Sequence, residues 1–139
     1  MALKIQPSLM EEFHLEETDK QFGSEGTMVT FRQATRGDEE ARNRLFAMVE
    51  KQYKKNDVIS FTSDISIDDV QRREIYLTLA ACNIANEDGE KMLFKFKNSR
   101  IDMTEEQFKD AWSKLPYDAA REMIKFCGKV NPQWTSEGN

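Results

Sequence analysis

The spacing of hydrophobic residues predicts a strand near the start of the patterned part of the chain. Residues 27–35, TMVTFRQAT, alternate in period two, with Val29 and Phe31 on one side and Met28 and Thr30 on the other. β-Branched and aromatic residues in this pattern predict a strand. Apolar residues on both sides indicate that part of the strand is covered on both faces.

A helical period follows the strand. We expect Asp38 to be the N-cap of this helix, with Glu39 and Glu40 where the helix dipole favours negative charge. One face of the predicted helix carries apolar side chains, namely Ala41, Leu45, Met48, Val49 and Tyr53.

The middle of the chain predicts a buried helix. Residues 58–64 are short, β-branched and apolar, which fits either a strand or an extended link. We expect Ser66 to cap a helix over residues 67–85. Nine of the eleven residues from Ile75 to Ala85 are apolar, so we expect other elements to surround this part of the helix.

A turn at Asp88-Gly89 leads into a basic, aromatic stretch, residues 91–100. Alternation over residues 91–96 predicts a short strand. Alternating aromatic and lysine side chains could also stack nucleic-acid bases, but we interpret the stretch as a half-buried strand.

Two amphipathic helices close the pattern. Thr104 and Gln107 have the spacing of a capping box, and we expect Pro116 to end this helix and to open the next. The first helix has apolar residues in helical spacing at Phe108, Ala111, Trp112 and Leu115. The apolar stripe of the second helix is Ala120, Met123, Ile124, Cys127 and Val130.

These elements predict a mainly α-helical α+β fold with about four helices and two or three short strands. We expect a flexible N-terminal arm over residues 1–26, which has room for one short strand, a single helical domain over residues 27–134 and a disordered tail over residues 135–139. A chain of 139 residues is long enough to bury a core without disulfides.

Composition narrows the class of partner. The formal net charge of −5 disfavours nucleic acid as the main partner, because phosphate binding needs clustered Lys and Arg. We see no apolar run long enough to span a membrane and no signal peptide, so we expect an intracellular protein whose thiols, Cys82 and Cys127, are buried and reduced.

The residues of common active sites are missing from the pattern. His14 is the only histidine and lies in the predicted arm, which argues against His-based nucleophilic catalysis and multi-histidine metal sites. Residues 84–95 resemble a calcium loop weakly, but its first position is Ile84 and its twelfth is Lys95. Paired carboxylates stand at predicted helix starts, where dipole complementation explains them. We therefore expect no enzyme activity, no metal and no cofactor.

Trp134 follows Asn131-Pro132 beyond the last predicted helix. The side chain either folds back to cap the core or is an exposed anchor for a partner, because aromatic residues are favoured in both settings.

Four segments, taken in order, resemble a known family. The segments are GTMVTFRQATRGDEEARNRLF (26–46), DGEKMLFKF (88–96), FKDAWSKLPYDAAREMI (108–124) and VNPQW (130–134). This order is similar to that of the small tail assembly chaperones of long-tailed bacteriophages. Residues 1–25 have no counterpart in the resemblance.

The resemblance implies a non-enzymatic role in the host cytoplasm. Such chaperones bind the tape-measure protein, a very long and mostly helical chain, keep it soluble and help to recruit tail tube protein. We therefore expect protein partners, no nucleic acid and no membrane, and the sequence is compatible with a homo-oligomer. Our candidate partner-binding residues are Phe108, Trp112, Leu115, Met123 and Trp134.

Two other functions fit the same sequence. A head–tail connector or tail-completion protein would also act by contact, but would stay in the virion. An acidic inhibitor of a host defence system would imitate nucleic acid and would need a continuous stripe of carboxylates, whereas here Lys and Arg interrupt them.

Overall fold

A computed structural model describes residues 1–45 and 67–135, the last without its side chain. Its helices are α1 (Glu16–Phe22), a helix over residues 36–45, α3 (Ile67–Thr78), α4 (Glu105–Ser113), α5 (Tyr117–Val130) and α6 (Pro132–Thr135). Its strands are β1 (Met10–His14), β2 (Met28–Arg32), β3 (Leu79–Cys82), β4 (Phe96–Lys97) and β5 (Arg100–Ile101). The expected α+β class is confirmed.

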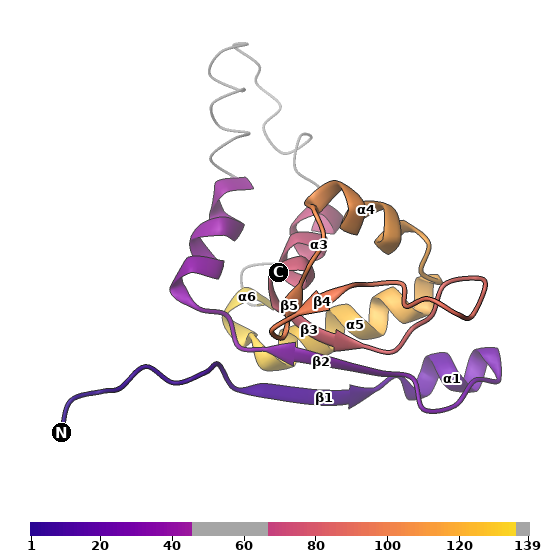
Figure 1. The fold of residues 1–139 in the computed structure, drawn as a ribbon, viewed down its shortest axis with the longest axis horizontal. Coiled ribbons are helices and arrows are strands. Elements are labelled where there is room, and N and C mark those ends of the chain that lie inside the picture. Colours follow the sequence, from indigo (N-terminus) through magenta and orange to yellow (C-terminus); the bar gives the residue numbers. More distant parts are fainter. Residues whose placement is uncertain (46–66, 136–139) are drawn as a thin grey trace, which may run out of the picture.

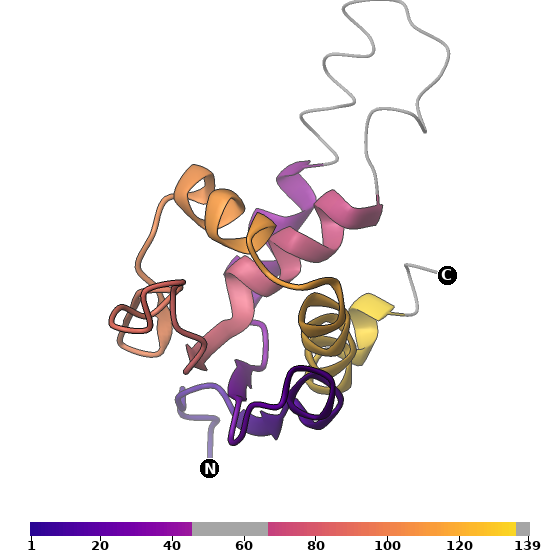
Figure 2. The same cartoon turned by 90° about the vertical axis from the view of Figure 1, so that its right-hand side faces the viewer.

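A three-stranded antiparallel sheet in the order β1-β2-β3 supports the helices. α5 lies along this sheet and contacts both β1 and β2, and Phe13 of β1 stacks on Phe126 of α5 with ring centroids 4.5 Å apart (Figure 1). α3 contacts α4 and α5, so the three helices gather on one side of the sheet (Figure 2). β4 and β5 form a separate hairpin.

The core lies between the sheet and these helices. Its largest fully buried side chains include Phe31 of β2, Ile75 of α3, Phe94, Phe108 of α4 and Met123 of α5. Phe108 lies at the centre of an aromatic group, 5.2 Å from Tyr76 and 5.3 Å from Phe94 between ring centroids. β2, α3, β3, α4 and α5 therefore all contribute to one apolar cluster, and Phe13 of β1 packs against it.

The strand over β2, the turn at Gly89 and the capping box of α4 are confirmed. Gly89 has a φ of 72°, which a residue without Cβ adopts freely. The Thr104 hydroxyl accepts a hydrogen bond from the Gln107 backbone N–H, and the Gln107 side chain accepts one from the Thr104 N–H, at 3.1 and 3.0 Å.

The predicted helix over residues 67–85 is wrong beyond Thr78. An apolar run fits a buried helix and a buried strand equally well, and here β3 pairs with the open side of β2. The Arg32 guanidinium donates to the carbonyl of Leu77, one of the last carbonyls of α3, which have no partner inside the helix. The helix therefore ends where another element satisfies its terminus.

The strand predicted over residues 91–96 is also largely wrong. Only Met92 bridges to Ala85, and the strand β4 begins at Phe96. Leu93 and Phe94 are buried as neighbours while Met92 is exposed, so the expected alternation does not hold.

The N-terminal residues differ from the expectation as well. Residues 10–22, which the pattern assigns to a flexible arm, form β1 and α1, and Leu15 between them is fully buried in the core. The sequence allows one short strand in this stretch, and β1 is such a strand, whereas the helix α1 is not predicted. The second half of the helix after Asp38, the segment 58–64, the Ser66 cap and the tail after Thr135 lie outside the described residues.

Candidate protein-binding surface

The five predicted partner-binding residues separate into two groups. Phe108, Met123 and Trp134 are interior side chains, with exposed fractions of 1%, 0% and 3%. Trp112 and Leu115 are half-buried and pack against the edge of the core. Only the second group offers surface to a partner in this structure.

Tyr117 joins the accessible pair in a feature that we name the aromatic corner, defined as Trp112, Leu115 and Tyr117. The Tyr117 side chain is 78% exposed, which is high for so large an apolar residue. The sequence pattern does not indicate Tyr117, because the residue falls outside both apolar stripes, at the first position of α5.

Local backbone interactions hold the aromatic corner in place. The last carbonyls of α4 accept hydrogen bonds from Lys114 and Leu115, whose N–H groups donate to Ala111 and Trp112 at 3.1 Å each. Pro116 is the N-cap of α5, because its fixed φ of −57° suits the start of a helix. Trp112 in turn stacks on buried Phe108, with centroids 6.1 Å apart. The accessible surface thus rests directly on the core.

Trp134 folds back onto the domain, as one of the two interpretations of its position expects. The Arg42 guanidinium carbon lies 5.4 Å from the centroid of its ring, a cation–π distance. Arg42 also donates to the Glu74 carboxylate at 2.7 Å, so the ring covers a buried ion pair. Trp134 Nε1 is buried without a hydrogen-bond acceptor among the described residues.

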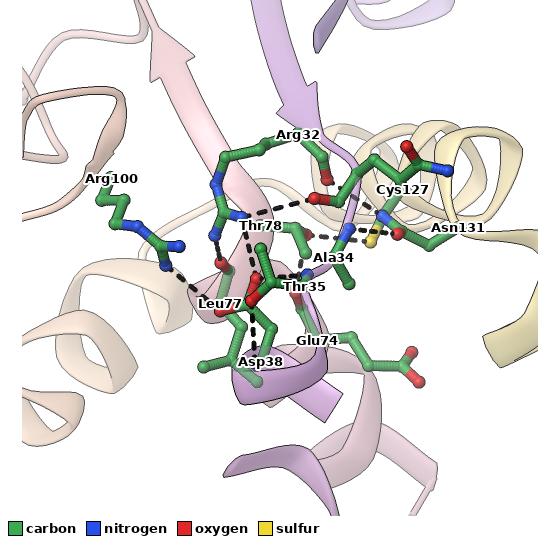
Figure 3. Close-up of polar contacts among 11 residues, drawn as sticks. Arg32, Ala34, Thr35, Asp38, Glu74, Leu77, Thr78, Arg100, Cys127 and Asn131 are labelled. Atoms are coloured by element: carbon green, nitrogen blue, oxygen red, sulfur yellow. Dashed lines mark hydrogen bonds and ion pairs between the residues drawn. The ribbon is translucent and has the colours of Figure 1, made fainter. Parts of the chain in front are cut away.

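A second buried ion pair joins β2 to the helix over residues 36–45 (Figure 3). Arg32 donates to Asp38 Oδ2 at 2.8 Å, and both side chains are almost wholly buried. Arg100 of β5 reaches the other carboxylate oxygen at 3.1 Å. A single carboxylate therefore connects two consecutive elements, β2 and the helix over residues 36–45, to β5, whose Arg100 is 62 positions from Asp38 in the sequence.

Asp38 is not the N-cap of its helix, contrary to the expectation. Thr35 holds that place, because its hydroxyl accepts from the Asp38 N–H at 3.2 Å and its own N–H donates to Asp38 Oδ2 at 2.9 Å. Burial alone would raise the pKa of Asp38, but hydrogen bonds from Arg32, the Thr35 N–H and Arg100 outweigh it and lower the pKa below 3.8. The carboxylate is thus stabilised in its charged form.

Asn131 connects the C-terminal end of α5 to the chain after β2 (Figure 3). Its side-chain oxygen accepts from the Ala34 N–H at 2.8 Å, and its side-chain nitrogen donates to the Arg32 carbonyl at 3.2 Å. The residue is fully buried. The Asn-Pro of the VNPQW segment therefore has a structural explanation: it anchors the turn that brings Trp134 back to Arg42.

The thiols are poor nucleophiles in this fold. Burial raises the pKa of Cys82 to about 11 and that of Cys127 to about 12. Both cysteines are free.

His14, on β1, is exposed and lies 4.0 Å from the carboxylate of Glu12.

The described part of the chain gives little evidence of a binding site for a metal ion or a small molecule. Within residues 1–45 and 67–135, no cluster of His, Cys, Asp and Glu is arranged to hold a metal ion, and no helix has the length and apolar character needed to cross a bilayer. A depression of about 80 Å³ lies between α3 and α4. Its charged lining is already engaged in ion pairs, Arg72–Asp69 at 3.0 Å and Arg73–Glu105 at 2.6 Å.

Comparison of the chain with models of protein families, with curated proteins and with solved structures finds no match.

Proposed function

We propose that this protein is a phage tail assembly chaperone that binds the tape-measure protein in the host cytoplasm and keeps it soluble until the tail is built. In this proposal the protein acts through contact area and carries out no reaction. A long helix with an apolar stripe aggregates unless another apolar surface covers it, and a small domain can supply that surface. The net charge of −5 would keep the loaded assembly dispersed.

The observation that carries the proposal is the aromatic corner. Trp112, Leu115 and Tyr117 all lie within FKDAWSKLPYDAAREMI, one of the segments on which the family resemblance rests. An aromatic side chain on a rigid base is a common anchor in protein interfaces, because little conformational entropy is lost when it binds. Phe108, Met123 and Trp134 are not part of the proposed surface, because all three side chains are interior.

Co-expression with the tape-measure protein from the same phage genome tests the proposal. Tyr117→Asp should leave the fold intact, since the side chain is exposed, and should weaken client binding by about 2 kcal/mol, or about thirtyfold. The client would then move from the soluble fraction to the pellet. Ile67→Asp is the matched control, because Ile67 is 50% exposed but stands at the start of α3, away from the aromatic corner.

The outcomes separate the competing functions. A client that stays soluble with both variants contradicts the aromatic corner as the binding surface. A client that is insoluble even with the unmodified protein contradicts the chaperone function. Mass spectrometry of purified virions adds an independent criterion, because a connector or tail-completion protein would remain in the particle whereas a chaperone would be absent.

A further inference from the structure

Residues 1–9 form an extended stretch that leads away from the domain, to which the Leu9 carbonyl still bonds (Figure 1). We now restrict the name N-terminal arm to residues 1–9, because residues 10–22 form β1 and α1. Leu3 and Ile5 are 91% and 88% exposed, and Leu9 is 75% exposed. Large apolar side chains at alternating positions of an extended chain have the pattern of a strand with one apolar face. A segment of this kind, with its large apolar side chains exposed, is suited to pair with another strand.

The sheet offers an unpaired edge beside the N-terminal arm. β1 is an outer strand in the order β1-β2-β3, and no other described strand pairs with its outer side. The Leu15 N–H donates to the Thr27 carbonyl, and the Leu9 carbonyl accepts from the Gln33 N–H, at 2.9 and 2.8 Å. In an antiparallel ladder, odd-numbered residues of β1 therefore bond to β2, and even-numbered residues direct their N–H and C=O groups to the open edge.

Pro7 fits this arrangement. It is odd-numbered, so in an extended continuation of β1 its missing N–H would face the β2 side. Pro7 thus prevents the arm from continuing the ladder with its own β2, but it leaves the outward groups of Lys4, Gln6 and Ser8 free to bond.

Charge indicates what pairs with the edge. Glu11 and Glu12 make β1 acidic, so two β1 strands placed directly against each other would repel. The arm has the opposite character, since Lys4 is its only charged side chain. The N-terminal arm of a second copy therefore complements the β1 edge in charge, in backbone groups and in apolar character.

We propose that two copies of this chain exchange their N-terminal arms, each arm adding as an antiparallel strand to the β1 edge of the other. The register that places Lys4 opposite Glu12 also places Gln6 opposite Met10 and centres the two-fold axis at Ser8. In this register Leu3 lies opposite Phe13, on the face where Phe13 stacks on Phe126. Such a contact is isologous and closed, so it ends at a dimer. This inference does not depend on the proposed chaperone function.

Sedimentation velocity on the full chain over a range of concentrations tests the exchange. The unmodified protein should dimerise, and Leu3→Asp/Ile5→Asp should make it monomeric with an unchanged thermal unfolding curve, because these side chains lie outside the core. Lys4→Glu should raise the dimer dissociation constant about tenfold, since each of the two symmetric pairs becomes repulsive. The double variant Lys4→Glu/Glu12→Lys should restore dimerisation. Lys109→Glu on α4 has the same charge change and should have no effect.

Hydrogen exchange provides the register. Backbone amides of the even-numbered residues Met10 and Glu12 should become protected as the protein concentration rises, while the odd-numbered Glu11 and Phe13, already bonded to β2, should not change. A protein that stays monomeric, a dimer that survives Leu3→Asp/Ile5→Asp, or a charge swap that fails to restore the dimer would each overturn the proposal.

Discussion

At the scale of single residues, one carboxylate does most to organise the polar interior. Asp38 accepts hydrogen bonds from Arg32, from the Thr35 N–H and from Arg100, and so connects β2, the following helix and β5. The sequence pattern around Asp38 indicates only a local role as a helix cap, because a cap can be recognised within four residues. The Arg32 guanidinium comes from the preceding strand and that of Arg100 from β5, and neither contact has a periodic signal in the sequence.

Asp38→Asn should destabilise the protein by about 3 kcal/mol at neutral pH, because it leaves the buried Arg32 without its counter-charge. The pKa of Asp38 is lowered in the folded state, so this stabilisation is present above the ordinary value of 3.8 and is lost as the pH falls through the lower folded pKa. Urea unfolding of both proteins from pH 7 to pH 3 should show the difference in unfolding free energy shrinking below about pH 4.

Asp110→Asn is the matched control for that experiment. The Asp110 carboxylate is exposed and lies 3.8 Å from Lys114, so its loss should change the unfolding free energy by less than about 0.5 kcal/mol. A pH-independent difference for Asp38→Asn would contradict the assignment of its stabilising effect to the charged form.

At the scale of elements, α1 shows how a distant residue can supply a helix cap. Leu15, at the N-cap position, has no side-chain acceptor. Glu122 of α5 provides one instead, accepting from the Thr18 N–H at 2.6 Å and from the Thr18 hydroxyl at 2.5 Å. A buried carboxylate at this position also complements the positive end of the helix dipole. The structure of residues 16–22 thus depends on a residue more than a hundred positions away.

Glu122→Ala should cost about 2 kcal/mol in unfolding free energy, because it leaves the buried N–H of Thr18 without an acceptor. The loss should be local first, with the amides of α1 exchanging faster than those of α3. Glu122→Gln keeps an acceptor oxygen and should cost less. Glu17→Ala removes an exposed carboxylate of the same helix, 3.9 Å from Arg121, and should change little. Unchanged exchange in α1 after Glu122→Ala would show that the cap is not needed.

The sequence distance over which residues interact decides which elements can be predicted from the sequence. Thr104, Gln107 and Pro116 act on their own neighbours, so the boundaries of α4 and the start of α5 follow from local chemistry. The sequence pattern does not predict the hairpin of β4 and β5, in which Asn98 and Ser99 adopt positive φ angles of 53° and 59°. Asn tolerates positive φ better than most residues. Asn98, in a two-residue loop between Phe96–Lys97 and Arg100–Ile101, is therefore a local signal for a hairpin.

At the scale of the whole molecule, the reactivity of the buried thiols measures how often the protein unfolds. Thr78 Oγ1 lies 3.4 Å from Cys127 Sγ, deep between α3 and α5. With the pKa raised to about 12, the Cys127 thiolate is scarce at pH 8 and is also inaccessible.

Thiol modification at pH 8 should therefore be much slower in the native protein than in urea, and Cys127 should react more slowly than the partly buried Cys82. Mass spectrometry of the labelled protein distinguishes the two positions. Cys127 becomes accessible only when the protein unfolds. Destabilising the protein with Asp38→Asn should therefore speed the labelling of Cys127 in proportion to the unfolded population. Equal rates for Cys127 in native and unfolded protein would contradict this burial.

The sequence by itself determined the features that depend on neighbours along the chain: the α+β class, the strand β2, the capped helix α4, the corner at Pro116 and the turn at Gly89. Only the tertiary structure decided the end of α3, the folding of residues 10–22 and the interior position of Phe108, Met123 and Trp134. The physical reason is that an apolar residue has the same pattern whether it faces the core or a partner, and a helix or strand end buried in the fold is satisfied by whichever distant group reaches it. Arg32 at Leu77, Glu122 at Thr18 and Asn131 at Ala34 are such groups, and only their three-dimensional positions reveal them.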